Sequence, residues 1–400
     1  MSLTDSPSVP EAVLGVYAPP AAVFVRGCGS WLIDAEGRRY LDFTSGIAVN
    51  ALGHGAPEVR AAIEEALQSG LIHASNLFRT APAEALAGEL IAASFPGSVF
   101  FCNSGAEAGE ASLKFARRWA RSVGGDEKHE FVAFRGGFHG RLFGTLATTD
   151  REKYRAPFEP LMPGVRWADV GDLASVEAVV DPARTAAVVI EPIQGEGGIR
   201  PVPASFLRAL RELCSARGVA LIFDEIQCGL GRTGDLFGFQ ESGVRPDLLS
   251  LAKPLAGGLP MGAVIAAPHI AETIQPGDHG TTFGGGPMVA GVARAVLSTV
   301  SAPEFLEGVR ERGARVSATL ERFRADGLGI VEIRGRGLMW GIELDRPAGP
   351  VVEAARDLGL LVCSAGARVV RLLPSLNIPM VELDEGLSIL GRALATEQAS

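Results

Sequence analysis

Lysine is rare in this chain, and one lysine stands where it could do chemistry. The 400 residues contain 33 arginines but only four lysines, of which three lie among polar or charged neighbours. Lys253 instead follows the mostly apolar run Leu248–Ala252. A lysine removed from water loses its proton more easily, and its free amine can attack a carbonyl carbon to form a Schiff base. The alternative is a side chain that extends to water or pairs with a carboxylate.

A pair of carboxylates follows another apolar run. Val219–Phe223 leads directly into Asp224 and Glu225. In α/β sheets, ligands bind beyond the carboxyl ends of the strands, so an acid here can face a ligand while the strand holds it. The alternative is an acidic cap or turn. The following Gly229–Gly234 has the spacing GxGxxG, but no apolar helix comes after it, which favours a flexible loop over a dinucleotide site.

Further segments carry groups that could bind anions. Asn103–Ala106 follows a short apolar run and opens a helix, whose first N–H groups would point at a phosphate; the alternative is an ordinary helix cap. Gly280–Gly286 is rich in hydroxyls and backbone N–H groups. Arg141 and Arg371 lie among apolar residues, where a guanidinium needs a carboxylate or phosphate partner. For each arginine, the alternative is a structural ion pair.

Together, these groups indicate pyridoxal 5′-phosphate as a cofactor. This cofactor needs a Schiff-base lysine, an acid opposite its pyridinium nitrogen, an anion cradle and usually an aromatic ring on its face. An acid about 4 Å from the ring nitrogen would contribute roughly 4 kcal/mol at an effective dielectric constant of about 20, which favours the protonated nitrogen. The protonated ring can then absorb the electron pair that remains when the substrate loses its proton.

The elements that must position these groups alternate along the chain. Short strands are expected in the first fifty residues, and from Pro57 helices alternate with short, mostly apolar runs, as is typical of a parallel sheet covered on both faces. We predict an α/β protein with a large domain at residues 56–300. Residues 1–55 (N-terminal strands and an arm) and 301–400 are expected to form a smaller α+β domain. The apolar runs are Val99–Cys102, Phe131–Phe134, Ala186–Ile190, Val219–Phe223, Leu248–Ala252 and Ala263–Ala267.

The composition excludes several classes of protein. The chain is 47% hydrophobic and 21% charged, with a net charge of −9, so we expect no nucleic-acid or anionic-membrane surface. No stretch approaches the ~20 apolar residues of a membrane span, and the first residues lack the features of a signal peptide. The five cysteines never have CxxC spacing, so we expect neither a disulfide framework nor a metal site. These features favour a cytoplasmic protein.

Several long motifs are shared with a known family. The chain resembles the class III aminotransferases of the fold-type-I pyridoxal-phosphate superfamily, most closely the acetylornithine/ornithine aminotransferase branch. The resemblance extends from about Tyr17 to Ile378, and it implies a homodimer with shared active sites. Its motifs are Asp42–Asn50, Asn103–Glu107, Phe138–Arg141, Glu191–Gly198, Asp224–Gln227, Leu251–Lys253 and His279–Gly285.

The resemblance implies cofactor-binding roles for particular residues. Lys253 matches the lysine that forms the Schiff base and later moves the substrate proton, and Asp224 matches the partner of the pyridinium nitrogen. The other implied cofactor residues are Gln227 near the ring hydroxyl, Phe138 on the ring face, Gly105 and Ala106 in the phosphate cradle, Glu225 and Ile226 in the Asp224–Gln227 motif, and Thr282, which the neighbouring subunit would donate to the phosphate.

The resemblance also implies how substrates bind. Arg141 and Arg371 match two carboxylate clamps, and Glu196 resembles a glutamate that pairs with Arg371 for one substrate and releases it for the other. Thr281 and Tyr17 match substrate-contacting positions. The implied reaction moves the terminal amine of N-acetylornithine to the cofactor and then to 2-oxoglutarate, giving N-acetylglutamate semialdehyde and glutamate, as in arginine biosynthesis.

Several alternative functions would use much of the same chemistry. Ornithine, succinylornithine or a carrier-linked aminoadipate semialdehyde could replace N-acetylornithine, although Phe138-His-Gly resembles the acetylornithine type more than the Phe-Trp-Gly of ornithine enzymes. An aminomutase of the same fold would need no external acceptor, and the paired clamps argue against it. A cofactor-binding protein without catalysis is a third reading, against which the complete set of groups argues. Gly286 and Gly109 depart from the family pattern, in which asparagine is common at both positions.

Overall fold

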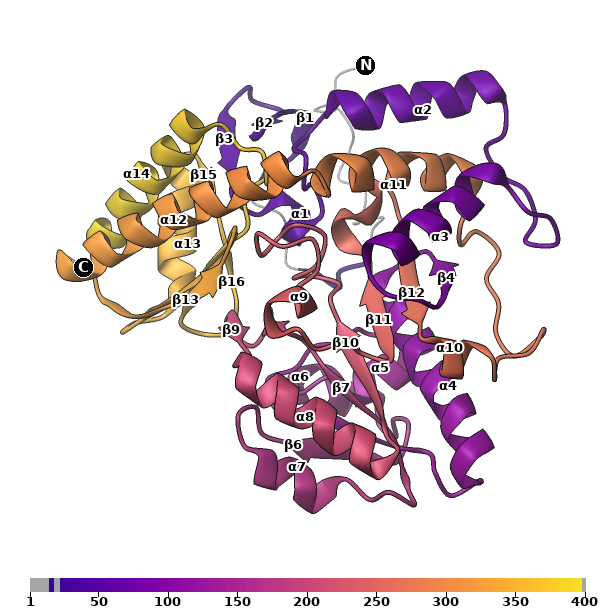
Figure 1. Ribbon diagram of the computed structural model, residues 1–400. Coiled ribbons are helices and arrows are strands. Elements are labelled where there is room, and N and C mark those ends of the chain that lie inside the picture. The colour runs from indigo at the N-terminus through magenta and orange to yellow at the C-terminus, as the bar shows by residue number, and fades with distance from the viewer. Residues whose placement is uncertain (1–13, 18–21, 398–400) are drawn as a thin grey trace.

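A seven-stranded sheet forms the centre of the molecule (Figure 1). The computed structural model describes residues 14–17 and 22–397. Strand β12 runs opposite to the other six, which are mutually parallel. The fold is therefore the predicted α/β type with a mostly parallel sheet. The strand order is β4 (Ser98–Cys102), β12 (Gly262–Ala266), β11 (Leu248–Leu251), β10 (Ala220–Asp224), β7 (Thr185–Ile190), β5 (Glu130–Phe134) and β6 (Val165–Ala168).

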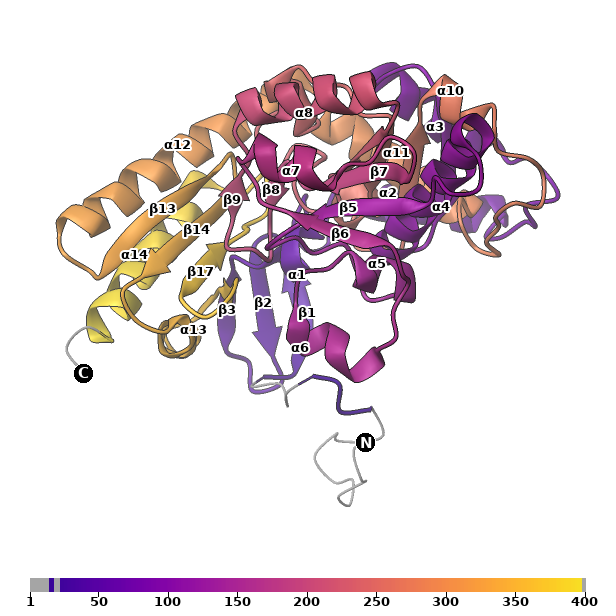
Figure 2. The ribbon, with the colours of Figure 1, turned by 90° about the horizontal axis from the view of Figure 1, so that it is seen from below.

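Helices bury both faces of this sheet. In β10, Leu221 and Phe223 point into one apolar cluster, whereas Ala220 and Ile222 point into another. Both sets are fully apolar because neither face meets water, which explains the uninterrupted apolar runs. Helix α4 (Gly105–Gly124) covers one face. The opposite face packs against α3 (Ala81–Ala93), α7 (Leu173–Val179), α8 (Ala204–Arg217) and α11 (Pro287–Val300), with α2 (Pro57–Ser69) outside α11 (Figures 1 and 2).

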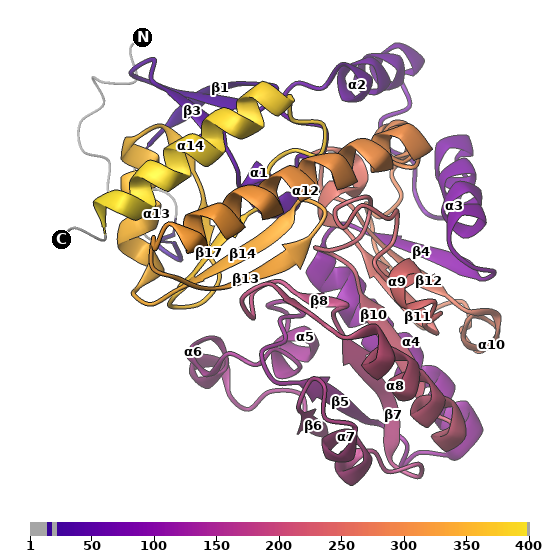
Figure 3. The same cartoon turned by 60° about the vertical axis from the view of Figure 1, so that its left-hand side comes forward.

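A second, smaller body carries the C-terminal quarter of the chain. Its antiparallel sheet has the order β13 (Ile330–Arg336), β14 (Met339–Leu344), β17 (Val369–Leu372) and β16 (Cys363–Ser364). Two long helices, α12 (Pro303–Ala325) and α14 (Met380–Thr396), lie side by side across it, and α13 (Ala348–Asp357) completes the layer (Figure 3).

The N-terminal strands pack with this smaller body. A sheet of β1 (Phe24–Cys28), β2 (Trp31–Asp34) and β3 (Arg39–Asp42) is extended by β15 (Leu360–Leu361), which pairs in parallel with β3. Leu41 and Phe43 share an apolar cluster with C-terminal residues. The division at residues 56 and 300 stays a prediction, which this pairing supports. Between α11 and α12 the chain bends by 67°.

The remaining elements are short and lie mainly at the edges of the two bodies. The edge strand β6 has no counterpart among the predicted apolar runs, because Arg166 interrupts it and only one of its four residues is buried. None of the described helices alone is long and apolar enough to span a membrane; α11 and α12 meet that test only as a bent pair. The short elements are α1 (Ser45–Ala48), α5 (Phe143–Ala147), α6 (Glu152–Arg155), η1 (Ala156–Phe158), β8 (Ile193–Gln194), β9 (Arg200–Pro201), α9 (Phe239–Ser242), η2 (Lys253–Ala256) and α10 (Pro268–Ala271).

The loop Gly229–Gly234 joins the two bodies. All six residues of this loop, which the sequence predicts to be flexible, are buried. The Arg232 guanidinium donates to the backbone carbonyls of Leu338 and Pro374 in the smaller body, and the Leu338 N–H donates back to the Arg232 carbonyl at 3.0 Å. Pro374 follows β17 closely, so this loop helps to set the position of that strand.

Candidate active site

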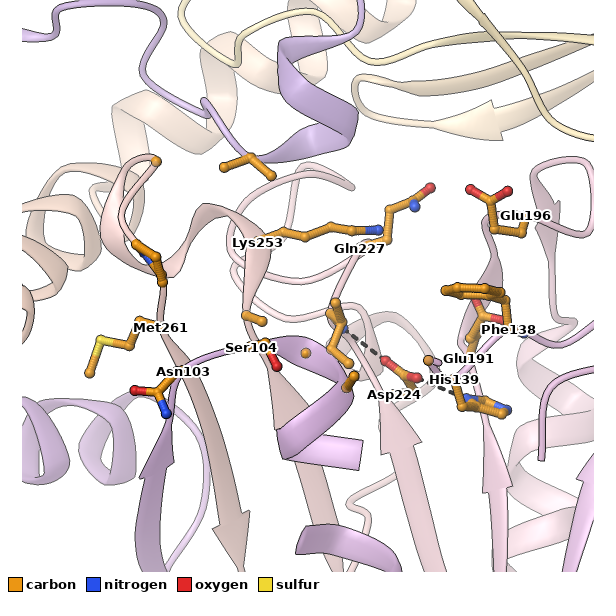
Figure 4. A pocket seen from close by; sticks show the side chains of 18 of the residues that line it. Asn103, Ser104, Phe138, His139, Glu191, Glu196, Asp224, Gln227, Lys253 and Met261 are labelled. Atoms are coloured by element: carbon orange, nitrogen blue, oxygen red, sulfur yellow. Dashed lines mark hydrogen bonds and ion pairs between the residues drawn. The ribbon is translucent and has the colours of Figure 1, made fainter. Parts of the chain in front are cut away.

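A cavity of about 310 Å³ opens beside the carboxyl ends of the large sheet (Figure 4). Because parallel strands end at the same edge of a sheet, loops far apart in sequence meet there. The segments after β4, β5, β7, β10 and β11 all contribute to its lining. The predicted residues that line it are Gly105, Ala106, Phe138, Glu196, Asp224, Ile226, Gln227 and Lys253.

Lys253 enters the cavity from the segment that follows β11. The strand ends at Leu251, and the backbone of Lys253 has a φ of 26°, a strained value for a residue with a side chain. Burial, assisted by the positive charge of Arg371, lowers the pKa of Lys253 to about 8. Among the described residues, no hydrogen bond or ion pair holds its amine. The amine is therefore available as a nucleophile and as a base.

Asp224 lies at the end of β10, next to β11 in the sheet, with its carboxylate buried. One carboxylate oxygen accepts from the Ile226 N–H at 3.1 Å, and the other lies 2.8 Å from Nδ1 of His139. Burial by itself would lower the pKa of His139, but the hydrogen bond and charge of Asp224 outweigh it, and the net shift is upward. Asp224 is thus an acid whose orientation is held by a buried partner.

His139 and Glu191 are functional candidates that the sequence analysis leaves out. Glu191 lines the cavity and accepts the N–H groups of Phe138 and Gly195, each at 2.9 Å. Burial, with the nearby charge of Asp224, raises the pKa of the Glu191 carboxyl to about 7. Both residues lie inside motifs that the chain shares with the family. Their position in those motifs is the signal by which the sequence could have indicated them as site residues.

The predicted anion cradle is the N-terminus of α4. Ser104 is the N-cap, and its hydroxyl accepts the Glu107 N–H at 3.2 Å, while Ser104, Gly105 and Ala106 line the cavity. A Cβ atom on Gly105 would lie 2.8 Å from Ile226, so only glycine permits this approach of helix and loop. The helix end offers partial positive charge to an anion there.

The two predicted clamps differ in their surroundings. Arg371, on β17, is 2% exposed and donates to Glu196 at 2.6 Å and to Gln227 at 3.3 Å. Arg141 is exposed, and among the described residues it has no carboxylate partner. Its guanidinium carbon instead lies 3.6 Å from the centre of the Tyr154 ring and 5.9 Å from that of Phe138.

Six predicted site residues lie outside the cavity lining: the two clamps described above, and Glu225, Tyr17, Thr281 and Thr282. The Glu225 carboxylate turns away and accepts the N–H groups of Gly238 and Phe239, because a buried carboxylate needs such donors. Tyr17 is 85% exposed. Thr281 accepts a hydrogen bond from Asn103 at 3.1 Å, and the neighbouring Thr282 is exposed. The structure thus gathers eight of the predicted residues around one cavity and adds Arg371 through its contacts with Glu196 and Gln227.

The two glycines that depart from the family pattern have different structural settings. A Cβ on Gly109 would lie 2.8 Å from Thr145 and 3.1 Å from the His139 carbonyl, so glycine lets α4 pack closely on that segment. Gly286 has φ −50° and ψ 136° at the N-cap of α11, where its conformation does not require glycine. The loop that carries Thr282 therefore enters α11 without a side-chain cap.

Comparisons with known proteins agree with this geometry. The family model for Aminotransferase class-III matches residues 16–394. The acetylornithine aminotransferase of Xanthomonas campestris is 46% identical over 399 residues, covering 98% of this chain and 97% of that relative. The N-acetylornithine aminotransferase structure from Stenotrophomonas maltophilia has a TM-score of 0.84 and 40% identity, covering 95% of this chain and 97% of the other.

A second solved structure matches the fold still better. The ornithine aminotransferase of Toxoplasma gondii has a TM-score of 0.92 and 32% identity, covering 97% of this chain and 94% of the other. The family model and the near-complete coverage apply to the whole chain rather than to one part of it. The chain belongs to the class III aminotransferases and is a pyridoxal-phosphate-dependent enzyme of that family.

Proposed function

We propose that this enzyme transfers the terminal amino group of N-acetylornithine to 2-oxoglutarate. The observation that carries the proposal is the different state of the two clamps: Arg371 is paired with Glu196, whereas Arg141 is open. N-acetylornithine has one carboxylate and 2-oxoglutarate has two. One open clamp suits the first substrate, and release of Glu196 would supply the second clamp for the other. The names and high identity of the relatives support the same donor.

The cavity fits pyridoxal phosphate on its own geometry. It places an amine of lowered pKa, a buried carboxylate and a helix N-terminus around one space, and the close contact of Gly105 with Ile226 keeps that helix end free of a side chain. We assign Lys253 to the carbonyl carbon, Asp224 to the pyridinium nitrogen, and Gly105 with Ala106 to the phosphate. Phe138 would cover the ring face. When bound, the cofactor accepts the amino group and withdraws electrons from the reacting carbon.

Lys253 then transfers the substrate proton. Its pKa of about 8 leaves part of the amine unprotonated near neutral pH, so it can take a proton from the substrate carbon and return it. Asp224 places its carboxylate at the far end of the cavity, and His139 holds that carboxylate in place with its Nδ1–H. The backbone N–H of Phe138, held by Glu191, keeps the aromatic ring at the cavity wall.

The carboxylate clamps decide which substrate binds. With Glu196 on Arg371, the buried guanidinium is neutralised and a second substrate carboxylate has no place to bind. When 2-oxoglutarate enters, its carboxylate near the reacting carbon would replace Glu196 on Arg371, and its distal carboxylate would meet Arg141. Glu196 is only partly buried, so it can turn towards water when displaced.

We also propose a cytoplasmic homodimer whose active sites are shared. Thr282 is exposed beside Phe283, and the same region exposes Leu77 and Phe78, whose segment bonds to the Thr281 carbonyl through Asn76. Apolar side chains gathered in this way are typical of an interface. Light scattering of the purified protein would test the dimer, and a monomer with full activity would contradict it.

The reaction is tested by the visible absorption of the cofactor-saturated protein. N-acetylornithine without a keto acid should bleach the cofactor band, and 2-oxoglutarate should restore it. Bleaching with ornithine or succinylornithine but not with N-acetylornithine would keep the reaction class and replace the donor. Turnover that consumes no keto acid would contradict the transfer and point to a mutase.

A further inference from the structure

The open clamp Arg141 is held by an aromatic ring rather than by an acid. Its guanidinium carbon lies 3.6 Å from the centre of the Tyr154 ring, whereas the Phe138 ring is 5.9 Å away. An arginine side chain at the surface loses about 2 kcal/mol of rotamer entropy when it is fixed, so something must hold it if it is to wait in a binding position. Tyr154 is the closest such support among the described residues.

Tyr154 is itself attached to the cavity wall. It lies on α6, and its N–H donates to the Arg151 carbonyl at 2.8 Å. The preceding Asp150 accepts the Gly136 N–H at 2.7 Å and donates its own N–H to the Gly137 carbonyl at 2.9 Å. These bonds fasten the segment to the loop that carries Phe138.

The rings of Tyr154 and Phe138 also meet directly. Their centres are 6.5 Å apart at an interplanar angle of 82°, an edge-to-face contact of a favourable kind. Tyr154 therefore touches the ring assigned to the cofactor face and the guanidinium assigned to the substrate carboxylate. Through these two contacts, the position of the Phe138 ring can influence the position of the Arg141 guanidinium.

The same segment reaches the other clamp. The Arg151 guanidinium donates to the backbone carbonyl of Glu196, the residue that pairs with Arg371. Residues 150–155 thus contact both Arg141 and the residue that pairs with Arg371.

We propose that Tyr154 is a positioning residue that holds Arg141 ready for the substrate carboxylate. The face of an aromatic ring attracts a cation without neutralising it, so the N–H groups of the guanidinium stay free for the substrate. A carboxylate in the same place would compete with the substrate, as Glu196 does at Arg371. The inference rests on the proposed role of Arg141 as the clamp used by both substrates.

The test compares Tyr154→Leu with Tyr154→Phe. The loss of the ring should raise the KM for both N-acetylornithine and 2-oxoglutarate by about 3- to 30-fold, with a smaller change in kcat. Tyr154→Phe keeps the ring and should stay within about twofold of the wild type, because cation–π attraction does not need the hydroxyl. Equal losses in the two variants would overturn the proposal, as would an unchanged KM in Tyr154→Leu.

A donor without a carboxylate separates positioning from general damage to the site. N-acetyl-1,4-diaminobutane is N-acetylornithine without its carboxylate, so its kcat/KM should be the same in wild type and Tyr154→Leu. An equal fall for both donors would show that Tyr154 supports the cavity as a whole and would overturn the proposal.

A double-mutant cycle gives an independent measurement. In an Arg141→Ala background, Tyr154→Leu should add no more than about twofold to the KM, because its effect passes through Arg141. Additive losses would contradict the proposal. If the wild type rejects N-acetylornithine but uses another carboxylate-bearing donor, the proposed substrate fails, and the cycle is measured with that donor and with 2-oxoglutarate.

Discussion

The two arginines assigned to substrate carboxylates show two ways of holding a cation. Arg371 is buried on a central strand of the small sheet and is neutralised by Glu196, with Gln227 and Cys363 as further contacts. Arg141 is exposed, follows a loop and lies against aromatic rings. A buried guanidinium without an acid would be costly, so Arg371 needs an exchangeable partner. At the surface water lowers that cost, and a ring is enough to hold the charge in place.

This difference matches what each clamp must do. In the proposed reaction, the buried clamp would become available only after Glu196 leaves, which would make it selective for a substrate that brings its own carboxylate. The exposed clamp would be available at all times and would serve both halves of the reaction. The two arrangements together would allow one cavity to accept two substrates of unequal charge.

The largest loss is expected when the lysine in the cavity is removed. Lys253→Ala deletes the proposed nucleophile and proton carrier, so turnover should fall on the order of 10⁴-fold or more. Both clamps remain, so substrate should still bind. Steady-state rates with binding measured by calorimetry would check both points, and retained full activity would remove Lys253 from the mechanism.

Removal of the buried clamp should affect one half-reaction. In Arg371→Ala, Glu196 loses its partner and 2-oxoglutarate loses a charged contact worth about 2–5 kcal/mol, or roughly 30- to 5,000-fold in kcat/KM. The N-acetylornithine half-reaction should change far less, because Arg371 is neutralised there. Rapid measurements of each half-reaction would show the split, and equal losses in both would contradict it.

The two clamps should also differ in their effect on Lys253. The charge of Arg371 contributes to the lowered pKa of the Lys253 amine, after burial. Since the free amine attacks the cofactor, attachment of pyridoxal phosphate to the apoprotein should slow about tenfold per pH unit below a pH of about 8 and level off above it.

The same pH profile can be measured for two matched variants. Arg371→Ala removes a nearby positive charge, so the midpoint should move to higher pH, whereas Arg141→Ala should leave it unchanged. Stopped-flow absorbance of the apoprotein mixed with cofactor would measure both. A midpoint that moves in the Arg141 variant alone would reverse the assignment of the two clamps.

The smallest effect is expected when the buried clamp is made to resemble the open one. Glu196→Gln keeps a hydrogen-bonding side chain but removes the negative charge, so displacement by a substrate carboxylate becomes easier. The KM for 2-oxoglutarate should fall by about 3- to 10-fold, which corresponds to the net worth of a modest charged interaction. The kcat/KM for glutamate as the amino donor should rise relative to that for N-acetylornithine. An unchanged ratio of the two donors would show that Glu196 does not control the clamp.

Much of the fold follows from local pattern. The apolar runs predicted along the large sheet all appear as strands within one or two residues, because a strand covered on both faces must be apolar throughout. The antiparallel direction of β12 and the edge strand β6 do not follow in this way. Strand direction depends on the path of the chain between strands, and an edge strand is only half covered, so neither leaves a clear local signal.

Local sequence pattern is enough to indicate the chemical parts of the site. Asp224 ends one apolar strand and Lys253 follows another, and such strands deliver the residues at their ends to one edge of a parallel sheet. These features depend on residues close together in the chain, so the pattern carries them.

The partners of these groups follow from the folded structure and not from local pattern. His139 meets Asp224 across 85 residues of sequence, and Glu196 meets Arg371 across 175. The ring of Tyr154 under Arg141, the inward or outward turn of Glu225 and the lowered pKa of Lys253 are decided in the same way. Each depends on burial and on distances between segments that meet only in the folded chain, and the Coulomb energy between charged groups depends on both their separation and their exposure to water.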